Sequence, residues 1–227
     1  MDKHLLAVGM SGQIALVDRR EISSDHCARR SGELHLVVFL TISTEHLALR
    51  AFTHEDAEGL LRIYRAPEVN RYLMTSPLDH PGAEQAAARR AERQSLRDEG
   101  DVLAVAVDEA HSGELIGDFS LKLLDASLGR AEIGFILSPQ YAGRGYATEA
   151  GRALLDIGFT DERIQRVIGV CNADNVSSQK LMSRLGMRRE AHFVQAEMLK
   201  GEIVDTMLYA ILRTEHRANA VPAGQIS

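Results

Sequence analysis

Two glycines separated by one residue, Gly143 and Gly145, stand between a predicted strand and a predicted helix, and they constrain the fold strongly. The apolar run 131–137 predicts a strand, Pro139 ends it, and residues 147–159 have a helical pattern. Glycines let the backbone turn tightly and approach a ligand closely. The first N–H groups of a helix have no partners inside it, and the positive end of the helix dipole lies there. The turn therefore predicts an anion site suited to a pyrophosphate, to which Arg144 could add a full charge.

The remaining patterns predict a mixed α/β sheet with helices over its faces. Thr53 and Asp56 are spaced almost as a capping box, which places a helix start there, while Pro77 and Pro81 are expected to break the chain. A hairpin is expected over residues 5–8 and 14–17, and the tail after Arg217 is expected to fray. Strands are predicted over residues 34–42, 47–52, 102–107, 115–124, 131–137, 167–171, 187–199 and 203–212, and helices over residues 83–98, 147–159 and 177–185.

The 227 residues predict one domain plus an extension. Residues 1–45 form an N-terminal extension to which the sequence assigns no role, residues 46–213 form the domain, and residues 214–227 form a C-terminal tail.

Composition excludes several classes of protein. The net charge of -6 argues against general nucleic-acid binding and mildly favours a cationic substrate. The longest stretch without Asp, Glu, Lys or Arg, residues 4–17, is too short for a membrane span. Two cysteines, Cys27 and Cys171, make no disulfide framework, which predicts a reducing compartment and a cytoplasmic protein. The histidines are too far apart for a metal pair, so no metal site is expected.

The longer string Gln140-x-x-Gly143-x-Gly145 resembles the acyl-CoA pyrophosphate motif of the GNAT superfamily of N-acetyltransferases. The resemblance covers residues 46–213 and implies the GNAT acyl-CoA N-acyltransferase fold, an α/β fold. Its central mixed, mostly antiparallel sheet has splayed parallel strands, and helices lie on both faces. Five further segments are similar to the RimJ/RimL-type branch: Leu47-x-Leu-Arg50, Glu68-Val-x-Arg-Tyr72, Glu132-Ile-Gly-Phe135, Asn172-Ala-Asp-Asn175 with Ser178, and Leu185-Gly-Met187.

The resemblance implies acetyl-CoA as co-substrate, with its pantetheine arm between the splayed strands 131–137 and 167–171. The arm would pair with exposed backbone groups near Phe135, Ile136 and Leu137. Asn175 would bond the pantetheine or stabilise its loop, and a plain helix N-cap is an equal alternative. The pyrophosphate would lie on the N–H groups that follow Gln140, namely those of Ala142, Gly143, Arg144, Gly145, Tyr146 and Ala147.

The chemistry that the resemblance implies is acyl transfer to an amine, which must lose a proton before it attacks. Glu132 is the candidate base, with a surface carboxylate as the alternative, and a backbone N–H near Phe135 or Ile136 would hold the oxyanion. Many members of the family have a tyrosine where this chain has Met182, so Ser178 is the candidate donor to the departing sulfur. Hydrogen bonding at the helix start is the alternative role for Ser178.

The sequence thus predicts acetyl transfer to a primary amine by direct attack in a ternary complex. The acceptor could be a protein N-terminus or a small cationic amine, and Tyr64, Tyr72 and Glu197 are candidates for its pocket. The resemblance also implies a homodimer, because members of the family often pair through the sheet or the last strands. Two other readings stay open: a non-catalytic acyl-CoA-binding sensor, which the missing tyrosine favours, and a nucleotide-binding α/β protein, which the absence of a third glycine disfavours.

Overall fold

The structure is a computed structural model that describes residues 5–8, 14–17 and 41–220. The chain divides into two compact units, Met1–Leu34 and His35–Ser227. In the first unit, β1 (Leu5–Val8) pairs antiparallel with β2 (Ile14–Val17), which confirms the expected hairpin. Most of the strand predicted over residues 34–42 lies outside the described residues, and its end coincides with the start of β3 (Ile42–Ser43). The division at residue 45 stays a prediction.

The second unit is built on an eight-stranded mixed sheet, as the sequence predicts. The strands lie in the order β3-β4-β5-β6-β7-β8-β10-β9, and of the pairs between them only β7 with β8 is parallel. The remaining strands are β4 (Leu47–Ala51), β5 (Val102–Glu109), β6 (Leu115–Asp125), β7 (Arg130–Leu137), β8 (Arg166–Asn172), β9 (Arg188–Leu199) and β10 (Glu202–Leu212).

The parallel strands β7 and β8 separate after only three paired positions. Their last pair is Glu132 with Ile168, yet β7 continues to Leu137 and β8 to Asn172. Beyond that pair each strand stays bonded to its other neighbour, β7 to β6 and β8 to β10. The sheet therefore opens between β7 and β8, which confirms the expected splay.

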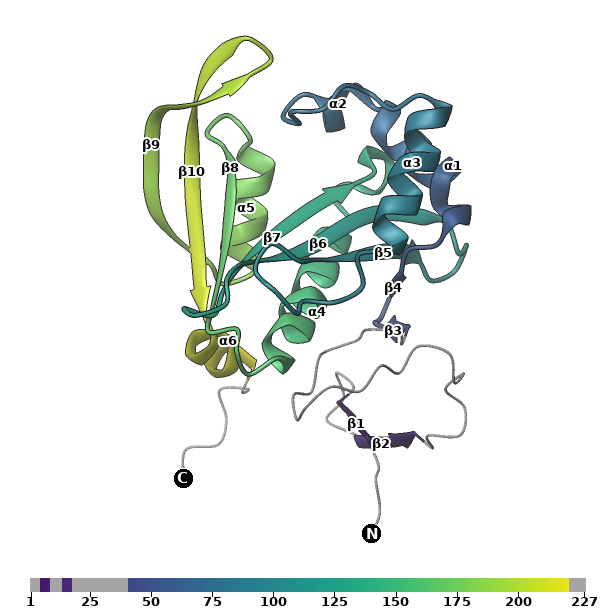
Figure 1. Cartoon of the computed structure of the whole chain (residues 1–227), viewed down its shortest axis with the longest axis vertical. Coiled ribbons are helices and arrows are strands. Elements are labelled where there is room, and N and C mark those ends of the chain that lie inside the picture. The colour runs from purple at the N-terminus through teal and green to yellow at the C-terminus, as the bar shows by residue number, and fades with distance from the viewer. Residues whose placement is uncertain (1–4, 9–13, 18–40, 221–227) are drawn as a thin grey trace. The chain divides into compact units, whose positions relative to one another are not determined.

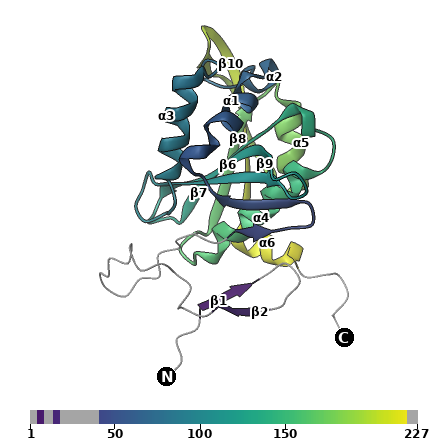
Figure 2. The ribbon, with the colours of Figure 1, turned by 90° about the vertical axis from the view of Figure 1, so that its right-hand side faces the viewer.

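Helices cover both faces of the sheet. α1 (Ala57–Arg65) and α3 (His80–Ala91) pack on one face through a cluster that includes Leu60, Ala86 and Ala104, and α4 (Tyr146–Thr160) packs on the opposite face against the larger core (Figures 1 and 2). The remaining helices are α2 (Pro67–Asn70), α5 (Val176–Arg184) and α6 (Arg213–Ala220), with short 3₁₀ turns η2 (His54–Asp56) and η3 (Pro139–Tyr141).

The capping box at Thr53 is confirmed, and it ties α1 to the sheet. The Asp56 carboxylate accepts the N–H of Thr53 at 2.7 Å and also pairs with Arg50 of β4 at 2.8 Å. Arg50 in turn pairs with Asp108 of β5 at 2.6 Å. Because these carboxylates are largely buried, the ion pairs hold α1 at a defined place beside β4 and β5.

Three expectations about helices are wrong. Pro81 does not break the chain: α3 begins at His80 with Asp79 as its N-cap, and proline is tolerated in a first turn because its missing N–H has no partner there. α3 ends at Ala91, well before residue 98. The expected fraying after Arg217 is contradicted as far as Ala220, where α6 ends. Within the described residues, no helix combines the length and apolar character that a membrane span requires.

Candidate functional site

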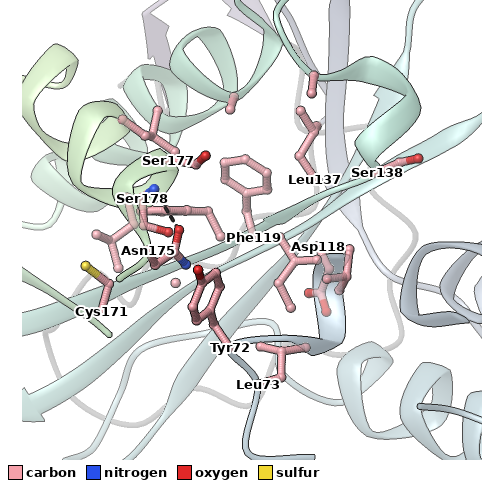
Figure 3. Close-up of a pocket in the computed structure, with 18 of the residues that line it drawn as sticks. Tyr72, Leu73, Asp118, Phe119, Leu137, Ser138, Cys171, Asn175, Ser177 and Ser178 are labelled. Atoms are coloured by element: carbon pink, nitrogen blue, oxygen red, sulfur yellow. Dashed lines mark hydrogen bonds between the residues drawn. The ribbon is translucent and has the colours of Figure 1, made fainter. Parts of the chain in front are cut away.

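A cleft of about 840 Å³ opens where β7 and β8 diverge. Figure 3 shows Asn175, Ser178 and Cys171 on one side of it and Leu137 and Ser138 on the other. Tyr72 and Leu73, from the segment after α2, approach from a third side. The loop between β7 and α4 forms one end of the cleft, so the glycine turn and the diverging strands belong to one site.

The glycine turn presents a row of N–H groups without partners. Gly143 and Gly145 have φ values of +80° and +86°, and an added Cβ at either would meet nothing within 4 Å. Among the described residues, the N–H groups of residues 143–147 make no hydrogen bond, whereas those of Thr148 and Glu149 donate to the Gly145 carbonyl. The N–H of Ala142 was expected to be free, and this is wrong because it donates to the Pro139 carbonyl at 3.1 Å. The N–H groups that remain available to an anion are therefore those of residues 143–147 at the start of α4.

Two residues of the motif point elsewhere. Gln140 and Arg144 are exposed and do not line the cleft, and the Arg144 guanidinium lies 5.1 Å from the centre of the Tyr141 ring. The start of α4 is held instead by Glu149, whose carboxylate accepts the N–H of His46 at 2.8 Å and the hydroxyl of Thr44. The sequence analysis did not predict this contact, because Thr44 and His46 are about a hundred residues from Glu149 in the chain.

The free edge of β7 faces the cleft. Phe135, Ile136 and Leu137 line it, and all three pair with β6 along the opposite edge of the strand. Since β8 no longer pairs here, the cleft-facing edge keeps backbone groups that an amide-bearing ligand could bond. Position 134 requires glycine, because a Cβ there would lie 2.8 Å from the Ser120 hydroxyl, and the cleft has no side chain at this point of β7.

Asn175 and Ser178 line the cleft at the start of α5, and both have a local role. The Asn175 carboxamide oxygen accepts the N–H of Ser178 at 3.1 Å, so the N-cap alternative is correct for that oxygen. The Ser178 hydroxyl makes no hydrogen bond to a described residue and is available to a ligand. Met182 is fully buried in the core and cannot serve as a donor.

Glu132 lies at the last paired position of β7 and is not among the residues that line the cleft. Burial raises the pKa of its carboxyl above the ordinary value, against the opposing effect of the Lys122 charge, and the negative charge of Glu197 adds to the increase. Glu132 is half-buried and two residues from Gly134, so it lies beside the cleft rather than in its wall. Its role as the base stays a prediction. Glu197 does not line the cleft.

A buried polar network that the sequence did not reveal lies in the wall of the cleft. Tyr64 donates its hydroxyl to Asp118 at 2.6 Å, and Arg90 donates from Nε to the same carboxylate oxygen at 2.7 Å. Arg90 also donates to the Tyr64 hydroxyl at 2.8 Å. Burial and the Asp118 charge raise the pKa of Tyr64, so this phenol stays protonated. The available signal was an aspartate inside the apolar strand Leu115–Asp125, since a buried carboxylate needs partners.

Cys171 lines the cleft from β8, and burial raises the pKa of its thiol to about 11. A thiol with this pKa is almost entirely protonated at neutral pH and is a poor nucleophile. Where the structure describes the chain, no cluster of three or more His, Cys, Asp or Glu side chains could hold a metal.

Splayed parallel strands, a glycine turn with unpaired N–H groups and a shared cleft define the class of acetyltransferases with the GNAT fold. Residues 46–188 match the model of the Acetyltransferase (GNAT) domain. The uncharacterized N-acetyltransferase p20 of Bacillus licheniformis is 30% identical over 176 residues, which are 78% of this chain and 98% of that protein. The chain therefore belongs to the GNAT family of N-acetyltransferases, an enzyme family that takes its acetyl group from acetyl-CoA.

Solved structures agree with this assignment. An acetyltransferase (GNAT family) from Bacillus anthracis aligns with a TM-score of 0.68 and 25% identity, over 77% of this chain and 99% of that one. The spermidine N-acetyltransferase of Vibrio cholerae, solved in complex with CoA and spermine, aligns with a TM-score of 0.65 and 20% identity, over 77% of this chain and 99% of that one. The second likeness supports the fold alone.

Proposed function

We propose that this enzyme transfers the acetyl group of acetyl-CoA to a primary amine, by direct attack within a ternary complex in the cleft between β7 and β8. The observation that carries the proposal is the row of unpaired N–H groups at residues 143–147, which opens onto the same cleft as the free edge of β7. The match of residues 46–188 to the GNAT acetyltransferase domain also supports the proposal.

The residues of the cleft fit acetyl-CoA, which would supply an activated acetyl thioester. The N–H groups of residues 143–147 would hold its pyrophosphate, and the edge of β7 at Phe135 to Leu137 would bond its pantetheine amides. The open space at Gly143 and Gly145 gives the phosphates room to approach the backbone. Asn175 also lines the cleft, and its carboxamide nitrogen, which makes no hydrogen bond to a described residue, would donate to the pantetheine.

Two side chains would assist the transfer. Glu132 accepts the proton of the attacking amine through a water molecule, because its carboxylate lies beside the cleft and not in the wall. Ser178 donates its hydroxyl toward the sulfur that departs, since no described residue occupies that hydroxyl. A direct transfer is favoured over an acetyl-cysteine route because the Cys171 thiol stays protonated.

The experiment that tests the function measures thiol release from acetyl-CoA with a panel of primary amines, beside calorimetric titration of CoA. We expect CoA binding and amine-dependent thiol release. The alternative of a non-catalytic acyl-CoA sensor is favoured by one observation, the buried Met182 in place of a tyrosine donor. Retained CoA binding with no thiol release for any amine would support the sensor and overturn the catalytic proposal.

We also propose that the protein forms a homodimer through β9. This strand lies at one end of the sheet and is exposed over most of its length. Large apolar side chains remain uncovered on β9 and β10: Phe193, Val194, Met198 and Ile203. An exposed apolar edge strand is a surface that proteins normally pair or cover. Light scattering should give twice the mass of the chain, and a Val194→Lys variant should return it to that of a monomer.

A further inference from the structure

Basic side chains outnumber acidic ones in the wall of the cleft, although the chain as a whole is acidic. The acidic residues that line it are Glu68 and Asp118, and the basic ones are Arg71, Arg90, Arg93, Lys180 and Arg184. The charge that an acceptor meets is set by these residues and not by the net charge of the chain, because exposed charges farther away than about 10 Å are screened by salt.

Asp118 cannot provide a free negative charge for a cationic acceptor. Its carboxylate oxygen already accepts hydrogen bonds from Tyr64 at 2.6 Å and from Arg90 at 2.7 Å. It is 8% exposed, and the Arg90 charge balances its own. Only Glu68 remains as an unpaired carboxylate in the part of the wall that the structure describes.

Three arginines that line the cleft make no ion pair with a described residue; of these Arg184 donates to the Lys180 carbonyl of its own helix, whereas the guanidinium groups of Arg71 and Arg93 make no hydrogen bond to a described residue. The Arg71 guanidinium lies 5.2 Å from the centre of the Tyr72 ring, and Tyr72 donates its hydroxyl to the Asp174 carbonyl at 3.0 Å. This contact orients Arg71 at the edge of the cleft. Both side chains are exposed and line the cleft, so a ligand can reach them.

Arg93 lies away from the glycine turn, across the sheet. Its carbonyl accepts the N–H of Ala104 in β5 at 2.7 Å. Ala104 is in register with Ser120 of β6, which is in register with Gly134 of β7. These three small residues line a floor two strand spacings wide, or about 10 Å, between the gap and Arg93, although Ala104 is only 3% exposed because α1 and α3 cover most of it. An acceptor can therefore extend across this floor from the reacting amine to the guanidinium.

We propose that the acceptor amine carries an anionic group, a carboxylate or a phosphate, that the exposed guanidinium groups of Arg71 and Arg93 in the wall of the cleft bind. The inference rests on the proposed acetyl transfer and names its substrate class. It replaces the small cationic amine that the net charge of the chain favours. Arg71 and Arg93 are expected to act on binding alone, because neither belongs to β7, to the glycine turn or to α5, which carry the groups assigned to acetyl-CoA and to the chemistry.

The test compares three amines of equal chain length: 4-aminobutanoate, butan-1-amine and butane-1,4-diamine. Thiol release from acetyl-CoA should give kcat/KM highest for 4-aminobutanoate and lowest for the diamine, with about a fivefold step between neighbours, as expected of partly exposed charge pairs. A second arm compares peptides that have aspartate or lysine after a free N-terminal serine. The aspartate peptide should react faster if the anionic group belongs to a protein N-terminus, and a preference confined to 4-aminobutanoate would indicate a small molecule.

The variants separate binding from chemistry. Arg71→Ala combined with Arg93→Ala should raise KM for 4-aminobutanoate about tenfold, leave kcat and the Kd of CoA nearly unchanged, and abolish the preference among the three amines. Arg65→Ala and Arg89→Ala are the matched controls, since both arginines are exposed near the ends of α1 and α3 and do not line the cleft. These controls should behave as the wild type.

The possible failures are distinguishable. A higher kcat/KM for the diamine than for 4-aminobutanoate would overturn the inference and leave acetyl transfer intact. A double variant that weakens CoA binding but keeps the order of the three amines would also overturn the inference and leave acetyl transfer intact. If no amine releases thiol, calorimetric titration of the three amines into the CoA complex decides the inference separately. Tighter binding of 4-aminobutanoate that the double variant loses would support it, and any other order would reject it.

Discussion

Replacing Gly145 by alanine should damage CoA binding more than it damages the fold. Gly145 has φ of +86° and is the N-cap of α4. An alanine in this left-handed region costs about 1–2 kcal/mol, which for a domain of this size lowers Tm by roughly 2–8 °C. The new Cβ would lie in the open space beside the unpaired N–H groups, where nothing else lies within 4 Å.

The effect on binding follows from those N–H groups. Displacing a phosphate oxygen from one of them removes a charge-assisted hydrogen bond, worth about 1.5–3 kcal/mol. That loss corresponds to a Kd for CoA that is roughly 10- to 150-fold weaker. Isothermal titration with CoA measures the affinity, and differential scanning calorimetry of the same preparation measures the stability.

Gly100→Ala is the matched control. Gly100 has φ of +95°, an added Cβ there also meets nothing within 4 Å, and the residue does not line the cleft. Its alanine variant should lose a similar amount of Tm and keep the wild-type Kd for CoA. If Gly145→Ala binds CoA as tightly as the wild type, or if both variants weaken binding equally, the N–H groups of the glycine turn do not hold the pyrophosphate.

Three further predictions concern the chemistry. Glu132→Gln should lower kcat about a hundredfold. Because burial raises the pKa of Glu132, wild-type activity should fall as the pH drops through that raised value and the carboxyl becomes protonated. If the Glu132→Gln variant keeps the pH profile of the wild type, another residue is the base. Ser178→Ala should lower kcat about tenfold with little change in KM, whereas Ser183→Ala, on the same helix but outside the cleft, should have no effect; equal rates in both would remove Ser178 from the reaction. Cys171→Ser should keep nearly full activity, since the thiol is protonated, and mass-spectrometric detection of an acetylated Cys171 during turnover would contradict direct transfer.

Much of the fold was predictable because its signals are local. Alternating apolar residues predicted most strands, and the spacing of Thr53 and Asp56 predicted the start of the first helix. The ends of helices were less predictable. Pro81 disrupts a helix interior but fits a first turn, and only the Asp79 cap decides which of the two applies.

In the candidate site, too, the features that depend on neighbouring residues were predictable and the others were not. The glycine turn was predictable because its conformation depends on two residues that lack a Cβ and on the helix that follows. The Ala142 N–H was assigned incorrectly because a single 3₁₀ turn, η3, uses it within the loop. The direction of the Arg144 side chain was not predictable either, since it depends on the Tyr141 ring.

The sequence by itself determined the order of the main strands and helices, the family and the glycine turn, since each depends on neighbouring residues or on a motif. Only the tertiary structure decided what lines the cleft. It brought Tyr64, Arg90 and Asp118 into one network from three separate elements, and it placed Glu132 beside the cleft instead of in its wall. Side chains far apart in the chain meet only when the sheet and its helices pack, so the net charge of -6 gave no indication that basic residues outnumber acidic ones in the lining of the cleft.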